Sequence, residues 1–138
     1  MFFFLEVGLQ IPVEDQIAKE IVDASVKIHK ALGPGLFESV YESVLSYELI
    51  KRGHSVERQV TIPVRYEGLV FEIGFKADII VDNKVIVELK SVQALQPVHA
   101  KQLLTYVRLA EKRLGILLNF GERMMKEGIR RMANNLPE

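Results

Sequence analysis

The sequence predicts an α/β fold in which helices cover a mixed central β-sheet. Stretches with helical periodicity and stretches rich in β-branched residues follow one another as helix, helix, three strands, helix, strand, helix. The run at 114–120 is apolar except for Asn119, which is typical of a central strand covered on both faces. A third observation is a short hairpin at 77–90 that carries charged residues among apolar neighbours.

Length and composition favour one globular domain. The chain has 138 residues, of which 49% are apolar and 26% charged, close to ordinary globular usage. It contains no cysteine, which excludes disulfides, thiolate zinc sites and cysteine nucleophiles and fits a cytoplasmic protein. The 18 basic and 18 acidic residues balance, which counts against a dedicated DNA-binding domain but permits a local basic groove. No apolar run is long enough to cross a membrane.

Two helices are expected first, after an N-terminal extension at 1–14. The first begins with Asp15 as its N-cap and ends before Gly33-Pro34-Gly35. Its apolar face is formed by Ile17, Ile21, Ala24, Ile28 and Leu32. The second runs from Glu38 to Arg52 and stops at Gly53. The single domain is expected to span 15–133.

Strands are expected next, at Val56–Tyr66 and Leu69–Phe75. Pro63 places the first strand at an edge or at a bulge, since proline cannot donate to a neighbouring strand. Gly74 is expected to form a bulge before the charged hairpin. Arg58 and Gln59 point to opposite faces of a regular strand, so only one of them should reach a cleft.

The C-terminal part predicts a helix, a strand and a further helix. The helix at Pro97–Leu109 starts with proline, which suits a first helical turn. The strand at Leu114–Phe120 follows, and an amphipathic helix with a basic side is expected at Glu122–Met132. Residues 134–138 are expected to form a frayed tail.

The hairpin at 77–90 contains the strongest candidate site. Runs at Ala77–Val81 and Val85–Lys90 flank Asp82-Asn83-Lys84, a sequence that favours a turn. A three-residue loop pairs Val81 with Val85 and places Asp78 opposite Glu88, with Lys90 on the same face as Glu88.

Such a pair of carboxylates is costly without a partner. Opposed side chains lie about 5 Å apart, and at a dielectric of about 20 they repel by roughly 3 kcal/mol. A divalent cation with oxygen ligands would offset this repulsion, which indicates a metal-dependent phosphodiesterase site. The alternative is a half-solvated hairpin in which Lys90 pairs with Asp78 or Glu88.

For the other candidate residues, a purely structural role explains the sequence about as well as a role in the site. Glu38 is either a first-turn acid favoured by the helix dipole or an additional carboxylate near the metal. Gln102 and Tyr106, four residues apart on one helix face, either bind substrate or lie at the surface. His29 is interpreted as a residue at the end of a helix with no catalytic or ligand role. His99 is a weak additional candidate for the site.

Four motifs in this order resemble the PD-(D/E)xK nuclease superfamily. Along the chain they are Gly35-Leu36-Phe37-Glu38-Ser39-Val40-Tyr41, then Asp78, then Glu88-Leu89-Lys90, and then Gln102-Leu103-Leu104-Thr105-Tyr106. The upstream motif is similar to that of the GxxExxY family, and the downstream motif to the RecB-like branch. The resemblance covers residues 15–121, and Ala77 stands where the superfamily name has proline.

The resemblance implies a restriction-endonuclease-like core and a nuclease that uses Mg²⁺ or Mn²⁺ and acts on DNA. It implies metal ligation by Asp78, Glu88, the backbone carbonyl of Leu89, and Glu38. Lys90 would orient the attacking water. The residues expected to hold the substrate are Gln102, Tyr106 and Tyr41.

Two other interpretations remain open from the sequence. In the first, the chain is a nuclease-fold module that binds nucleic acid or a protein partner without cleaving it. It is also compatible with a structural homodimer that associates through the apolar residues 1–10.

Overall fold

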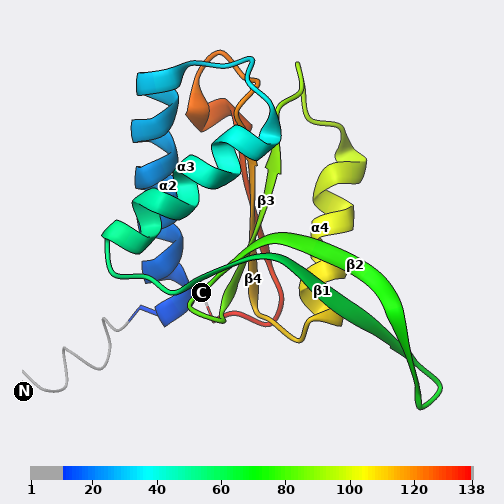
Figure 1. Cartoon of the computed structure of the whole chain (residues 1–138). Helices are drawn as coiled ribbons and strands as arrows, with labels where there is room; N and C mark the ends of the chain where they lie inside the picture. Colours follow the sequence, from blue (N-terminus) through cyan, green and yellow to red (C-terminus); the bar gives the residue numbers. More distant parts are fainter. Residues whose placement is uncertain (1–10, 138) are drawn as a thin grey trace, which may run out of the picture.

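The computed structural model describes residues 11–137 and contains one five-stranded sheet with helices on both sides (Figure 1). The predicted N-terminal extension at 1–14 therefore lies largely outside the described residues. The elements in chain order are α2 (Val13–Leu32), α3 (Glu38–Lys51), β1 (Val56–Tyr66), β2 (Leu69–Val81), β3 (Val85–Lys90), α4 (Pro97–Leu109), β4 (Leu114–Asn119), the 3₁₀ turn η1 (Met125–Gly128) and β5 (Ile129–Ala133). No helix within residues 11–137 is long and apolar enough to cross a membrane.

The sheet is mixed, as predicted. Its strands are ordered β1-β2-β3-β4-β5, and only the β3–β4 pair is parallel. The helix α4 connects these two strands, because parallel neighbours need a crossover connection. The carboxyl ends of β3 and β4 consequently lie side by side, at Lys90 and Asn119.

Helices cover both faces of the sheet, which confirms the predicted architecture. Residues of α2 and α3 pack with Ile79, Val87 and Ile116 in the larger hydrophobic cluster. On the opposite face, α4 packs on Ile80 and Ile86 in a smaller cluster. Both faces of the sheet are therefore covered by apolar side chains, and polar groups buried there need hydrogen-bond partners.

An ion-pair network around the buried Glu48 joins α2 to α3. Lys27 Nζ of α2 lies 3.0 Å from Glu48 Oε2 of α3, and Arg52 contacts both Glu48 and Asp23. The hydrogen bond from Lys27 lowers the pKa of Glu48 to about 2, with a further contribution from Arg52. This network fixes the crossing of the two helices.

The predicted N-cap of the first helix is wrong. Helix α2 begins at Val13 after the N-cap residue Pro12, so Asp15 lies inside the first turn. The Asp15 carboxylate still benefits from the helix dipole, and it accepts a hydrogen bond of 2.7 Å from Arg131 Nη2 of β5.

The predicted helix at Glu122–Met132 is also wrong. This segment forms η1 and then β5, which pairs antiparallel with β4 from Leu114↔Ala133 to Leu118↔Ile129. The buried strand β4 needs hydrogen-bond partners on both sides, and this requirement outweighs the helical pattern of side chains. Gly128 assists because a Cβ there would lie 2.3 Å from the carbonyl oxygen of Asn119.

Residues 134–136 are held against the body of the protein, contrary to the predicted frayed tail. The side chain of Asn134 donates to the Lys112 carbonyl at 3.0 Å, and Leu136 is buried in the larger hydrophobic cluster. The predicted tail at 134–138 therefore begins later than expected. The domain limits at 15 and 133 remain a prediction.

The strands β1 and β2 form a long hairpin that extends beyond the body of the protein (Figure 1). Strand β1 is an edge strand with a register shift between Ile62 and Val64, as Pro63 predicted. Strand β2 is continuous, whereas the sequence predicted separate strands at Leu69–Phe75 and Ala77–Val81, with a bulge at Gly74. A Cβ at Gly74 would lie 1.8 Å from the Ile62 carbonyl oxygen, so glycine permits the close approach of the two strands.

Candidate metal and catalytic site

The β2–β3 hairpin has the predicted register. Val81 pairs with Val85, Ile80 with Ile86 and Ile79 with Val87. Continuing this register places Asp78 opposite Glu88. The two acidic side chains therefore lie across neighbouring strands, where the turn length predicts them.

At this position, side chains take over the hydrogen bonds between the strands. The backbone N–H of Leu89 donates to Asp78 Oδ2 at 2.9 Å, and the backbone N–H of Asp78 donates to Glu88 Oε1 at 3.2 Å. The strands therefore separate at the carboxylates, and each carboxylate is oriented by a backbone group of the opposite strand. This arrangement holds both side chains in fixed positions.

Burial and the neighbouring charge keep Glu88 protonated at neutral pH. Burial raises the pKa of Glu88 to about 8, and the Asp78 carboxylate adds to this shift. The Lys90 charge acts in the opposite direction and lowers the pKa. A buried carboxyl of this kind releases its proton readily when a cation arrives.

Lys90 lies at the carboxyl end of β3 and is half-buried. Among the described residues, no ion pair within 4 Å connects Lys90 to Asp78 or to Glu88. The pairing of Lys90 with a carboxylate, which the sequence left open as the alternative, is therefore not observed. The ammonium group remains available for a water molecule or a phosphate.

Helix α4 brings Tyr106 toward the carboxylates. Its ring stacks on Phe75 of β2 with the centroids 3.7 Å apart. Burial raises the pKa of the Tyr106 hydroxyl, the charges of Glu88 and Asp78 add to this, and a hydrogen bond with Gln102 opposes it. Tyr106 therefore lies within the electrostatic influence of the acidic pair, and Gln102 interacts with Tyr106.

His99 has a structural role instead of a place at the carboxylates. Its Nδ1 accepts a hydrogen bond of 3.0 Å from the backbone N–H of Gln96, which is part of a capping box at the start of α4. This contact stabilises the helix that positions Tyr106.

A connection between α3 and the acidic pair was not predicted from the sequence. Gln59 Nε2 donates to Glu42 Oε1 at 2.6 Å and to Asp78 Oδ1 at 3.3 Å. Arg58 Nε donates to the other oxygen of Glu42, Oε2, at 2.9 Å. Arg58 and Gln59 therefore both reach Glu42, contrary to the prediction that they point to opposite faces.

An unusual backbone conformation explains this convergence. Gln59 has a φ of +50°, which side-chain-bearing residues seldom adopt. Strand β2 is irregular at the position opposite Gln59. A regular strand would place Ala77 and Ile79 on the same face, yet Ala77 packs in the smaller hydrophobic cluster and Ile79 in the larger one, on the opposite face of the sheet. The irregularity turns Gln59 and Asp78 out of the regular alternation and toward each other. The only signal in the sequence was an acidic residue at position 42, beside the apolar stripe of the second helix.

Glu38 and Tyr41 do not join the acidic pair. Glu38 is exposed at the first turn of α3, and within residues 11–137 no third acidic, histidine or cysteine side chain completes a metal cluster. Tyr41 is fully buried and stacks on Phe120 with centroids 4.3 Å apart. Its hydroxyl donates to the Gly33 carbonyl at 2.6 Å and accepts from Leu36 N–H at 3.2 Å, so it holds the loop at 33–36.

Three loops are joined at the end of the sheet that carries Lys90. Ser91 Oγ donates to the Leu36 carbonyl at 2.6 Å. The fully buried Asn119 accepts from the N–H groups of Val92 and Gly121 and donates to the Val92 carbonyl. These bonds keep the surroundings of Lys90 rigid.

The two carboxylates suit a hard divalent cation. Mg²⁺ is commonly held by one or two carboxylates, with waters and substrate phosphate completing the shell. Asp78 and Glu88 supply such a pair, and a positive charge between them would stabilise the ionised form of Glu88 against burial and the Asp78 charge. The arrangement is also suited to activating a water molecule beside a phosphate, with Lys90 at hand.

Comparison with known proteins identifies the family. No curated protein shows significant similarity to the chain. A solved structure described as "Crystal structure of SSO0001" is 18% identical, with a TM-score of 0.46, and the match covers 88% of this chain and 79% of that one. The family model of the PD-(D/E)XK nuclease superfamily matches residues 15–132, which is most of the sequence. The chain therefore belongs to the PD-(D/E)XK nuclease superfamily, and its mixed sheet flanked by helices is a restriction-endonuclease-like α/β fold.

Proposed function

We propose that this protein is a metal-dependent nuclease that hydrolyses phosphodiester bonds, with DNA as its substrate. The observation that carries the proposal is the opposed pair Asp78 and Glu88, in which the pKa of Glu88 is raised to about 8. A fold that needed only stability would gain from an apolar residue at either position. Membership of the nuclease superfamily supports the same conclusion.

Asp78 and Glu88 would hold Mg²⁺ or Mn²⁺, with the backbone carbonyl of Leu89 as a further expected ligand. A bound cation supplies a more acidic water and neutralises charge that develops on the phosphate. Glu38 is not included among the ligands, because it is exposed and, within residues 11–137, forms no three-residue metal cluster with the acidic pair.

The remaining groups position water and substrate. Lys90, free of ion pairs with the acidic pair, donates a hydrogen bond to the attacking water and stabilises negative charge on the phosphate. Gln102 and Tyr106 donate to phosphate oxygens from the α4 side. Gln59 and Glu42 orient Asp78 from the α3 side.

A cleavage assay tests the proposal. Wild-type protein is incubated with end-labelled single- and double-stranded DNA and RNA, with Mg²⁺, with Mn²⁺ and with chelator. We expect DNA cleavage that needs a divalent cation and that falls at least about 100-fold in Asp78→Asn and in Lys90→Ala. The matched controls Glu57→Gln and Lys84→Ala change exposed groups of the same types and should retain activity.

Two results would contradict the proposal. Cleavage that persists in Asp78→Asn would place the activity elsewhere or in a contaminant. Binding of nucleic acid by the wild type without cleavage under any condition would favour the non-cleaving module instead.

The finer family placement also belongs to the proposal. Assignment to the GxxExxY family rests on Gly35, Glu38 and Tyr41, and the RecB-like placement rests on Gln102 and Tyr106. The role of Tyr41 in holding the loop at 33–36 gives the tyrosine of that motif a structural purpose. A cytoplasmic location, which the lack of cysteine favours, and a homodimer stay predictions.

A further inference from the structure

A basic pocket lies at the end of the molecule that carries Lys90. It has a volume of about 580 Å³ and is formed by the C-terminal part of α2, the loop at 33–34 and the segment 123–126. In Figure 1, the loop after α2 and the segment before β5 meet near the end of β3.

The charge of this pocket is one-sided. Lys30, Arg123 and Lys126 line it, and no acidic side chain does. The chain as a whole balances its charges, with 18 basic and 18 acidic residues. Three like charges on one concave surface repel one another, so this surface attracts an anion.

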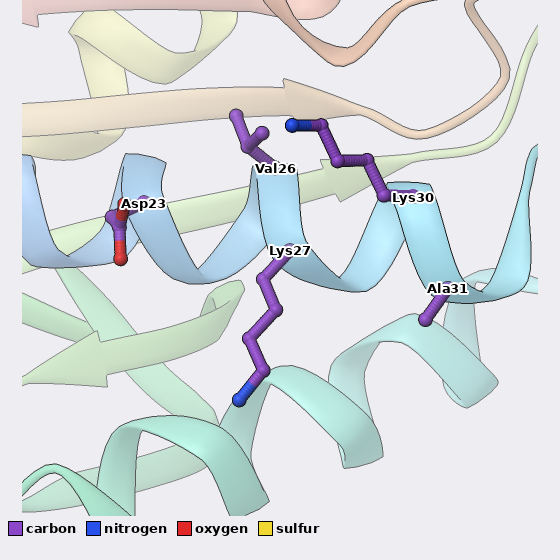
Figure 2. A pocket seen from close by; sticks show the side chains of 5 residues that line it. All are labelled: Asp23, Val26, Lys27, Lys30 and Ala31. Carbon is purple, nitrogen blue, oxygen red and sulfur yellow. The ribbon is translucent and has the colours of Figure 1, made fainter.

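These three cations are also free. In the part of the chain that the structure describes, none of them forms an ion pair within 4 Å with an acidic group. Figure 2 shows the contrast within α2: Lys27 points toward α3, where it meets Glu48, whereas Val26 and Lys30 point to the other side of the helix. Lys30 is thus available to a ligand, and Lys27 is not.

Hydrogen bonds hold both walls of the pocket in place. His29 Nε2 lies 2.8 Å from the carbonyl oxygen of Glu122, which fixes the segment before Arg123 to α2. On the other side, the Gly33 carbonyl accepts from the Tyr41 hydroxyl. The pocket is therefore preformed and needs no rearrangement to receive a ligand.

A short bonded path connects the pocket to the candidate catalytic lysine. The loop that begins at Gly33 continues to Leu36, whose carbonyl accepts the Ser91 hydroxyl, and Ser91 follows Lys90 directly. The pocket and Lys90 therefore share one rigid end of the sheet, on the carboxyl side of the parallel strands β3 and β4. Ligands of open α/β sheets bind at such ends.

We propose that Lys30, Arg123 and Lys126 bind the phosphodiester backbone of the nucleic acid at the same end of the sheet as Lys90. This proposal rests on the proposed function. A polyanion with closely spaced phosphates satisfies several separated cations at once, which a single small anion does not. The exposed Met124 and the apolar Val26 and Pro34 supply surface for the sugar. This surface explains how a chain with no net charge holds a polyanion.

Binding without cleavage tests the proposal. Fluorescence anisotropy is measured with labelled single- and double-stranded DNA and with RNA, in chelator, at salt concentrations from about 50 to about 250 mM. The test variant is the triple substitution Lys30→Ala, Arg123→Ala and Lys126→Ala. The matched control is Lys19→Ala, Lys84→Ala and Lys112→Ala, which removes the same charge from other parts of the surface.

We expect the test variant to bind at least about tenfold more weakly at the lowest salt. The slope of affinity against salt should fall by about 0.7 to 0.9 for each phosphate that the variant no longer neutralises. The control should bind like the wild type. Melting temperatures of all three proteins verify folding, and Lys30→Glu alone should weaken binding further than Lys30→Ala. Because the assay contains no divalent cation, an effect on cleavage does not influence the result.

Three outcomes would overturn the proposal. Equal weakening by the test and control variants would show only a general effect of charge. Absence of nucleic-acid binding by the wild type at the lowest salt would remove the ligand. Displacement of the oligonucleotide by micromolar inorganic phosphate would mark the pocket as a site for a small anion. A wild type that binds through this pocket but never cleaves would support the inference and contradict the proposed function.

Discussion

Glu88 illustrates how a single residue carries an electrostatic cost, which protonation relieves in the metal-free protein and which a bound cation would relieve in its place. Its pKa of about 8 arises first from burial and second from the carboxylate of Asp78. Replacing Asp78 by asparagine removes the second cause and leaves the first. We therefore expect the pKa of Glu88 to fall in Asp78→Asn but to stay above its ordinary value.

NMR titration of the side-chain carboxyl carbons measures this shift directly. In metal-free wild type, one glutamate carboxyl should titrate near pH 8, and this signal should be missing in Glu88→Gln. A wild-type protein in which every glutamate titrates in the ordinary acidic range would show that Glu88 and Asp78 do not interact as described.

Gln59 combines a strained backbone with two side-chain hydrogen bonds. Its φ of +50° is unfavourable for alanine and easy for glycine. Gln59→Ala and Gln59→Gly both remove the bonds to Glu42 and Asp78, so their difference reports the backbone conformation alone. We expect the glycine variant to be more stable than the alanine variant by about 1 kcal/mol in urea denaturation.

The same pair of variants also separates strain from positioning. Both should bind Mn²⁺ more weakly than the wild type, by roughly tenfold, if the amide orients Asp78. An alanine variant as stable as the glycine variant would argue against the strained conformation, and unchanged Mn²⁺ affinity in both would argue against the positioning role.

At the scale of elements, the position of α4 depends on one glycine of β4. A Cβ at Gly115 would lie 2.6 Å from Val107 Cγ2 and 2.9 Å from Leu103 Cδ1. Gly115→Ala should therefore push α4 from the sheet and lower the free energy of unfolding by about 1–3 kcal/mol.

The displacement has a functional consequence, because α4 carries Gln102 and Tyr106. We expect the ring stacking of Tyr106 on Phe75 to loosen, which tyrosine fluorescence or aromatic NMR shifts report. Wild-type stability and spectra in Gly115→Ala would contradict the close packing of α4 on β4.

Local patterns predicted the acidic hairpin because its geometry depends on only a few neighbouring residues. The length of the turn at 82–84 sets the register, and the register places Asp78 opposite Glu88. The link from Asp78 through Gln59 to Glu42 was not predicted, since it depends on the approach of α3 and on one unusual φ angle. Alternation in a regular strand indicated the wrong direction for Gln59.

The segment at 122–132 shows where local sequence patterns fail to predict the structure. Its side chains repeat at helical spacing, yet the unsatisfied edge of β4 takes Ile129–Ala133 as a strand. The sequence motif pointed to Glu38, whereas Glu42, one turn later, accepts the hydrogen bonds from Arg58 and Gln59. In both cases the outcome depends on tertiary partners that local patterns do not reveal.

At the scale of the whole molecule, the acidic pair should shape the dependence of stability on pH. Below pH 4.5 Glu88 is protonated in both the folded and the unfolded state, so its contribution is fully present. Between pH 4.5 and about 8 the unfolded chain releases this proton and the folded protein keeps it. Metal-free stability should therefore fall over this range, by a few kcal/mol, and level off above it.

Urea denaturation in chelator between about pH 5 and about pH 9 checks this expectation. Glu88→Gln should abolish most of the slope, because its side chain does not titrate. Glu48, with a pKa of about 2, acts in the opposite direction and only below pH 4.5, so it does not interfere. A wild-type profile that rises toward pH 8 would contradict the assigned state of Glu88.

The central claim is that Asp78 and Glu88 bind the divalent cation of a nuclease, and calorimetric titration of Mn²⁺ tests it most directly. Wild type, Asp78→Asn and the control Glu57→Gln are titrated at about pH 8, each with and without a short DNA oligonucleotide. We predict that the wild type and the control bind Mn²⁺, more tightly with the oligonucleotide, and that Asp78→Asn binds at least about 100-fold more weakly. Equal binding by all three proteins, or no binding by the wild type even with the oligonucleotide, would contradict the assignment.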